Sequence, residues 1–212
     1  MKIFCFGDSI TWGAWDSQGG WVARLRQKVE EHDRAIVPNP CNMVYNCGIS
    51  SDTTRQLLSR FKTDTDNRLL EGSDGDPIFI FCIGTNDCIK DTKTGDYWVS
   101  EHEYKANLHE LINQAEEYSS NIVFLGNLGV DESKTHPYAR DPDSETFNDD
   151  IEVYEKITAE VCVEHGLDFI DVYGQNKGED ITRYLSSDGL HENDEGHEYL
   201  ANLVYESISN WL

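Results

Sequence analysis

Three polar residues near the two ends of the chain have the types needed for nucleophilic catalysis. Ser9 comes shortly after an apolar run that ends at Phe6, whereas Asp188 and His191 lie three residues apart near the carboxyl terminus. A serine hydroxyl becomes a good nucleophile when an imidazole removes its proton, and a carboxylate on the other ring nitrogen fixes the imidazole. We therefore predict that Ser9, His191 and Asp188 act as nucleophile, base and orienting carboxylate.

Each of these residues also has a simpler interpretation. Gly-Asp-Ser is the composition of an ordinary turn, and Asp188 can cap a turn beside His191. The order Ser, Asp, His is that of the α/β-hydrolases, but no G-x-S-x-G elbow surrounds Ser9. The other candidate bases, His109, His165 and His197, fit surface or helix positions better than a catalytic role.

Strands that alternate with helices are expected to position these residues. The predicted strands are 3–6, 43–46, 77–83, 121–125 and 168–172, and the predicted helices are 19–31, 55–61, 104–115, 150–164 and 194–208. This alternation predicts an α/β fold, in which helices cover both faces of a central parallel sheet of about five strands. Neither repeats nor linkers interrupt the pattern, so residues 1–212 are expected to form one domain. Ser9 then lies at the carboxyl edge of the first strand, where open α/β sheets bind ligands.

Two long connections follow strand ends and are candidates for the walls of a pocket. Residues 88–103 contain Tyr97 and Trp98, and residues 126–147 contain Pro137, Tyr138 and Pro142. Solvated surface loops are an equally good interpretation of either segment. Trp12 is likewise a candidate for the acyl pocket or for plain packing.

The composition excludes several functions. The net charge of −23 argues against nucleic acid and anionic membrane surfaces as partners, and weakly against highly anionic substrates such as acyl-CoA. It fits either salt adaptation or, as we prefer, an ordinary acidic surface. No apolar run is long enough to span a membrane, and no signal peptide precedes the first strand, so we expect a cytoplasmic protein. The six cysteines lack metal-site spacing and are expected to be buried, reduced thiols.

Three blocks in order along the chain resemble the SGNH (GDSL-type) hydrolases: FGDSITWG near the start, GTND in the middle and DGLHEN near the end. The resemblance covers nearly the whole chain and implies a flavodoxin-like, three-layer domain with a serine nucleophile at Ser9. It also implies an oxyanion hole formed by the Ser9 backbone N–H, the Asn86 side chain and a backbone donor. The family's donor glycine maps onto Ser51, which departs from the pattern, while Gly48 matches an earlier glycine and is the alternative donor.

From these residues and this resemblance we expect a serine esterase that cleaves small-molecule carboxylic esters, with short acyl or acetyl groups. A non-catalytic binding module on the same fold is the main alternative, based on the Ser51 departure, and a phosphate-ester hydrolase is a weaker one. No phosphate loop or metal-ligand spacing is present, so we expect no cofactor and no metal. Asp8 and Asp87 are expected either to tune the site or to hold its loops. The sequence does not predict an oligomeric state.

Overall fold

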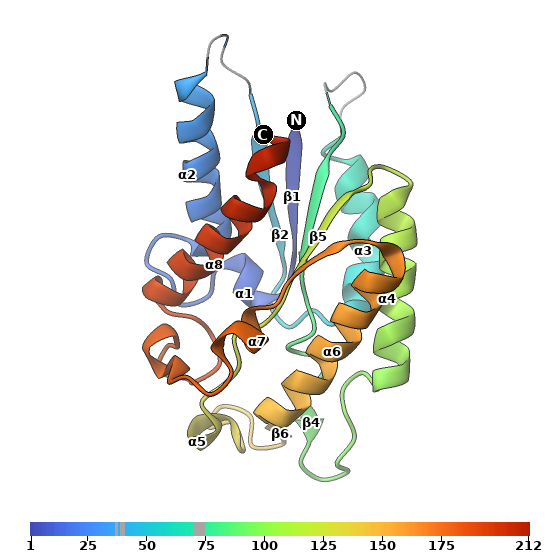
Figure 1. The fold of residues 1–212 in the computed structure, drawn as a ribbon. Helices are drawn as coiled ribbons and strands as arrows, with labels where there is room; N and C mark the ends of the chain where they lie inside the picture. The colour runs from blue at the N-terminus through green and yellow to red at the C-terminus, as the bar shows by residue number, and fades with distance from the viewer. Residues whose placement is uncertain (37, 39–40, 70–74) are drawn as a thin grey trace.

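A five-stranded parallel sheet forms the centre of the molecule in the computed structural model, which describes residues 1–36, 38, 41–69 and 75–212 (Figure 1). The strand order is β2-β1-β3-β5-β7, which is the flavodoxin-like order. The strands are β1 (Lys2–Gly7), β2 (Met43–Gly48), β3 (Ile78–Cys82), β5 (Asn121–Leu125) and β7 (Asp168–Ile170). The predicted α/β fold with a parallel sheet is therefore confirmed.

The central strands are apolar because helices cover both of their faces. Every residue of β1 and β3 is buried, as is typical of parallel strands in the middle of a covered sheet. Phe4, Phe6, Phe79 and Phe81 form stacked or tilted aromatic pairs on one face, and Phe61 from a neighbouring helix packs against them. This packing fixes the register in which Gly7 pairs with Gly48 and Cys82.

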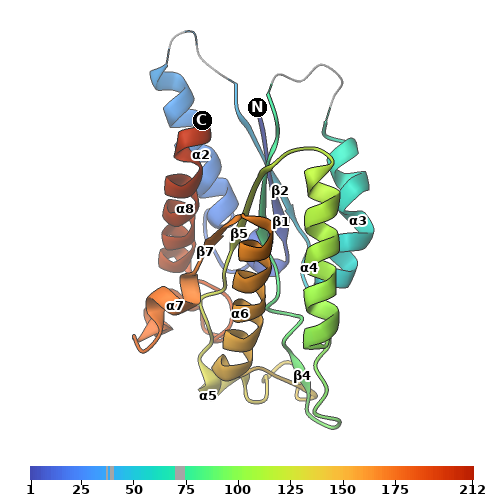
Figure 2. The same cartoon turned by 45° about the vertical axis from the view of Figure 1, so that its right-hand side comes forward.

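The longer helices lie in two layers. Helices α2 (Gly20–Ala35) and α8 (Asp194–Ile208) pack together on one face, and α3 (Thr54–Asp66), α4 (Glu101–Glu116) and α6 (Asn148–His165) cover the other (Figure 2). The short elements are α1 (Ser9–Trp12), α5 (Glu132–Thr135), α7 (Val172–Asn176), the 3-10 helices Ile181–Tyr184 and Ser209–Trp211, and an antiparallel pair formed by β4 (Lys90–Asp91) and β6 (Ser144–Glu145).

The predicted elements are present, with shifts at their ends. The final helix matches its predicted range, whereas α2 and α3 continue beyond theirs and β7 is shorter. The short helix α1 and the β4–β6 pair were not predicted, because segments of four and two residues show no periodicity. Within the described part of the chain, no helix is long and apolar enough to cross a membrane. The cytoplasmic location stays a prediction.

The cysteines differ from the prediction at one position. Five are buried, but Cys41 is exposed. It precedes β2, outside the apolar runs that bury Cys5 and Cys82.

Gly48, the last residue of β2, packs directly against the backbone of α1. A Cβ at this position would collide with backbone atoms of Trp12 and Thr11, which cannot move aside as a flexible side chain would. We therefore expect Gly48→Ala to lower the free energy of unfolding by about 1–3 kcal/mol or more, the usual cost of overpacking. Urea denaturation followed by circular dichroism measures this change.

Gly166→Ala is the matched control. Unlike Gly48, Gly166 has a positive φ, but nothing lies within 4 Å of a Cβ placed there, so backbone strain of about 1 kcal/mol without any collision is expected. A Gly48→Ala loss no larger than that of the control would show that the β2–α1 contact is not tightly packed.

Candidate active site

Ser9 lies where β1 ends and α1 begins. Asp8 precedes it as the N-cap of α1, and its carboxylate accepts the Ile10 N–H at 2.9 Å. The first residues of a helix leave backbone N–H groups without helical partners, so the Ser9 N–H and its hydroxyl are presented together at the carboxyl edge of the sheet. Ser9 is half-buried, as a side chain facing a cavity should be.

Asp188 and His191 lie in a compact loop before α8. The Ser186 N–H donates to the His191 carbonyl at 2.7 Å, and the Gly189 N–H donates to the Ser186 carbonyl at 3.1 Å. Gly189 has a φ of 76°, which favours glycine. The backbone thus turns at Gly189, which directs the Asp188 carboxylate towards the imidazole.

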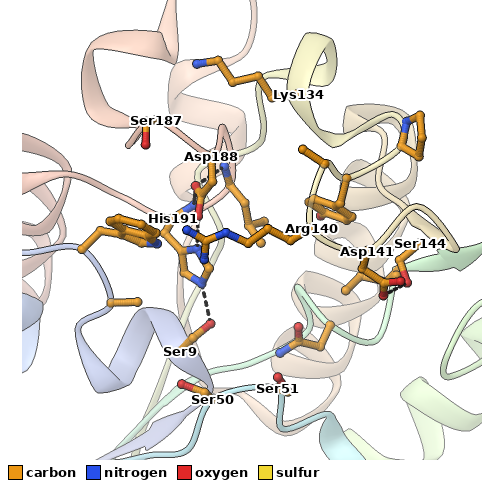
Figure 3. A pocket seen from close by; sticks show the side chains of 18 of the residues that line it. Ser9, Ser50, Ser51, Lys134, Arg140, Asp141, Ser144, Ser187, Asp188 and His191 are labelled. Atoms are coloured by element: carbon orange, nitrogen blue, oxygen red, sulfur yellow. Dashed lines mark hydrogen bonds and ion pairs between the residues drawn. The ribbon is translucent and has the colours of Figure 1, made fainter.

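Two consecutive hydrogen bonds connect the amino-terminal and carboxyl-terminal segments of the chain. The His191 Nδ1 lies 2.8 Å from Asp188 Oδ2, and its Nε2 lies 2.8 Å from Ser9 Oγ (Figure 3). With Asp188 ionised, Nδ1 carries the hydrogen that Asp188 accepts, and Nε2 accepts from the Ser9 hydroxyl. The structure thus brings together all three residues predicted for nucleophilic chemistry, whose catalytic roles remain predictions.

The two members of the Asp188–His191 pair have opposite pKa shifts. Burial alone would raise the pKa of Asp188, but hydrogen bonds from His191, the Leu190 N–H and the Ser186 hydroxyl hold it well below its usual range. Burial would lower the pKa of His191, but the bond to Asp188 and its charge outweigh this and raise it above its ordinary value. An ionised Asp188 thus stabilises the imidazolium that forms when His191 takes a proton.

Asn86, just after β3, also reaches the site. Its Nδ2 donates to the Asp52 carbonyl at 2.9 Å and contacts Asp8 Oδ2 at 3.3 Å. An amide nitrogen has two hydrogens, so one is firmly held and the other only weakly. The weakly held hydrogen is the one that could form a hydrogen bond to a negative charge that develops in the cavity.

Ser51 and Gly48 differ in their suitability as backbone donors. Ser51 lines the cavity, and its φ of 67° is in the left-handed region that favours glycine. This backbone explains why a glycine would fit the position, and why serine can still occupy it at some cost. The Gly48 N–H already donates to Asn46 Oδ1 at 2.9 Å, and Gly48 does not line the cavity.

A cavity of about 860 Å³ opens above Ser9, within the usual range for small-molecule sites. Both long connections contribute to its wall, which is one of the two alternatives that the sequence left open, although Tyr97 and Pro142 do not line it. Trp12 lines the cavity too, as does Trp15, which the sequence did not indicate. The lining residues are Ser9, Trp12, Ala14, Trp15, Ser50, Ser51, Asn86, Ile89, Trp98, Ser133, Lys134, Pro137, Tyr138, Ala139, Arg140, Asp141, Ser144, Ser187, Asp188, Leu190 and His191.

Asp8 and Asp87 hold the surrounding loops. Asp87 accepts the Thr54 N–H at 3.1 Å and the Thr54 hydroxyl at 2.5 Å, which fixes the start of α3 beside the site. Burial raises the pKa of Asp8 to about 7 and that of Asp87 to about 6. Neither carboxylate lines the cavity, so both support the residues that do.

Two contributors were missed in the sequence. Asn193 caps α8 through the Glu195 and Gly196 N–H groups, and its Nδ2 donates to the Leu185 carbonyl at 3.0 Å, which closes the loop carrying His191. Its place just before a helix is the signal for such a cap. Glu192 is fully buried, and burial raises its pKa to about 7.

Among the described residues, no three His, Cys, Asp or Glu side chains cluster as a metal site would.

Known proteins resemble this chain over nearly its whole length. Residues 5–199 match the model of the GDSL-like Lipase/Acylhydrolase family. A GDSL esterase/lipase of Arabidopsis thaliana is 26% identical over 221 residues, which span all of this chain and 85% of that protein.

Solved structures of other proteins also resemble this chain. A lipase/acylhydrolase from Enterococcus faecalis is 25% identical with a TM-score of 0.75, over 100% of this chain and 96% of that one. An acetylxylan esterase from Geobacillus stearothermophilus shares the fold, with 21% identity and a TM-score of 0.69 over 98% of this chain and 93% of that one.

Proposed function

The chain belongs to the GDSL-like lipase/acylhydrolase family and is a carboxylic-ester hydrolase, and we propose that it cleaves esters through an acyl-enzyme on Ser9. The observation that carries this proposal is the pair of 2.8 Å contacts that join Asp188, His191 and Ser9. Such an arrangement is suited to removing the serine proton at the moment of attack. The family membership favours turnover over the alternative of a non-catalytic binding module.

The reaction has two halves. In the first, Ser9 Oγ attacks the ester carbonyl carbon while His191 Nε2 takes the hydroxyl proton. The bond to the alcohol then breaks, and the alcohol leaves with that proton. In the second half, water attacks the acyl carbon and gives a proton to His191, and the acid leaves as Ser9 recovers its proton. Asp188 stabilises the imidazolium in both halves.

The negative charge that develops on the carbonyl oxygen needs donors placed in advance. We assign this role to the backbone N–H groups of Ser9 and Ser51 and to the Asn86 amide. The Ser51 N–H has no acceptor among the described residues, whereas the Gly48 N–H is occupied by Asn46. Ser51 therefore suits the role better than Gly48. Hydrogen bonds of this type often tighten only when the substrate is bound.

Short acyl or acetyl esters are the substrate class we propose, with a carbohydrate as the alcohol. Trp12, Trp15 and Trp98 are each more than a third exposed, and all three line the cavity. Exposed aromatic rings around a cavity offer flat apolar faces with polar edges, onto which a sugar ring can pack. The fold neighbour that is an acetylxylan esterase acts on such an ester.

Replacement of Ser9 tests the proposal directly. Ser9→Ala removes the nucleophile but keeps the backbone N–H, so kcat for p-nitrophenyl acetate should fall at least about 10³-fold with the thermal unfolding midpoint unchanged. The wild type should be labelled by a fluorophosphonate probe, and Ser9→Ala should not. Activity retained by Ser9→Ala would remove this residue from the mechanism.

The pH dependence follows from the raised pKa of His191. Only the neutral imidazole can take the serine proton, so kcat/KM should fall as the pH drops through an inflection above the ordinary value of 6.5. Asp188→Ala removes the cause of the raised pKa, so its residual activity should show a lower inflection. A profile that is flat over about pH 5.5–8.5 would argue against a histidine base.

Asn86→Ala tests the oxyanion donors. If the amide meets the developing charge, kcat should fall about 10²- to 10³-fold with a smaller change in KM. Asn42→Ala is the matched control, because Asn42 is also buried and hydrogen-bonded but does not line the cavity. An effect on KM alone, or an equal loss in the control, would place Asn86 outside the oxyanion hole.

A further inference from the structure

We propose that Arg140 selects ester substrates whose alcohol part carries a carboxylate, as an acidic sugar does. This inference rests on the proposed ester hydrolysis at Ser9 and specifies its substrate. Three observations carry it: an aromatic partner with a left-handed backbone, a guanidinium edge that no described residue pairs, and the position of Arg140 relative to His191.

The aromatic partner is Trp15. The Arg140 guanidinium lies 4.9 Å from the centre of the Trp15 ring, so the two side chains form a cation–π contact at the cavity. Trp15 has a φ of 68°, which is rare for a bulky residue. In the described part of the chain, Trp15 and Ser51 are the two non-glycine residues with positive φ, and both line the cavity. Backbone strain of this kind is typical of functional sites.

The guanidinium keeps its hydrogen-bonding edge free. The N–H donors of a guanidinium lie in its plane, and a cation–π contact uses none of them as a hydrogen bond, so they stay available. Arg140 forms no ion pair or hydrogen bond with any described residue, whereas Arg24 and Arg60 are each paired with carboxylates. A flat edge with parallel N–H donors fits a carboxylate in two parallel bonds.

Lys134 and Asp141, two other charged residues of the cavity wall, are not placed to bind a substrate carboxylate. Lys134, the other basic residue of the cavity wall, pairs with Asp131 at 3.0 Å, and Figure 3 shows its side chain pointing away from Ser9. Asp141 accepts from the Ser144 hydroxyl at 2.6 Å and lies on the far side of the cavity from the tip of Arg140. In a protein of net charge −23, Arg140 is thus a cation at the cavity that no residue in the described part of the chain pairs.

The position of Arg140 indicates which part of the ester carries the anion. Its side chain extends across the cavity towards the side where His191 lies, while Ser51 lies on the opposite side of Ser9 (Figure 3). His191 returns its proton to the leaving alcohol, so the alcohol part occupies the His191 side. The acyl oxygen faces the oxyanion donors. The carboxylate that Arg140 meets therefore belongs to the alcohol.

Two acetate esters of similar shape test the inference. 4-Acetoxybenzoate carries a carboxylate on the leaving alcohol, and 4-acetoxybenzamide carries a neutral amide at the same place. The measured quantity is the ratio of their kcat/KM values, compared between wild type and Arg140→Gln. This comparison cancels the intrinsic reactivity of the two esters and any change common to both.

Arg140→Gln should lower the anion-to-neutral ratio about 10- to 100-fold, the range for hydrogen bonds to a charged group. Arg140→Lys should keep part of the ratio, because it retains the charge without the flat edge. Arg183→Gln is the control: Arg183 also forms a cation–π contact, 4.4 Å from the centre of the Tyr184 ring, and donates to the Tyr184 hydroxyl, but it does not line the cavity. A ratio unchanged by Arg140→Gln, or lowered equally by Arg183→Gln, would overturn the proposal.

A binding measurement separates this proposal from the catalytic one. Ser9→Ala is titrated with each ester by calorimetry, and the anionic ester should bind about tenfold or more tightly, a preference that the added Arg140→Gln change removes. If the wild type cleaves neither ester but this preference is found, the proposed hydrolysis fails and anion recognition stands. Equal binding of the two esters would overturn anion recognition even if both are cleaved.

Discussion

His197, a buried histidine in α8, holds the carboxyl-terminal part of the chain against the segment that follows Ser9. The Ser9–His191 contact depends on this connection. His197 Nε2 lies 3.0 Å from the Ala14 carbonyl, and its Nδ1 accepts the Trp21 N–H at 3.2 Å. Burial lowers the pKa of His197, so the neutral ring can donate from one nitrogen and accept at the other. The imidazole thereby joins α8 to the segment that follows the nucleophile, and residues 182 positions apart are held within hydrogen-bonding distance.

The fold and most of the candidate site could be predicted from the sequence. The apolar runs of a parallel sheet are readily recognised, and each ends in polar residues at the same edge of the sheet. Ser9, Asn86 and His191 follow strands or precede a helix in blocks shared with a known family, so their proximity was expected. The structure adds the distances and the loop contacts that fix them, and it favours Ser51 over Gly48 as the backbone donor.

Other features could not be predicted, because they depend on how loops cross in space. The left-handed backbone at Trp15 has no sequence signal, since tryptophan does not favour that conformation. At Ser51 the only signal was the glycine that the family has at this position. Arg140 lies in a long connection without periodicity, and only the folded structure brings it onto Trp15. The net charge argued weakly against highly anionic substrates, but a whole-chain charge does not describe one cavity. A local cation at the catalytic edge changes the expectation for the substrate.

If the amino-terminal and carboxyl-terminal segments form one nucleophilic site, Ser9 is the residue that becomes acylated. Mass spectrometry of peptides from enzyme quenched in acid during turnover of p-nitrophenyl acetate tests this most directly. We expect one acetyl group on the peptide that contains Ser9, and none on the same peptide of the Ser9→Ala variant. Steady turnover with an acetyl group on another residue, or with no acylated peptide under conditions where acyl-enzyme breakdown limits the rate, would contradict it.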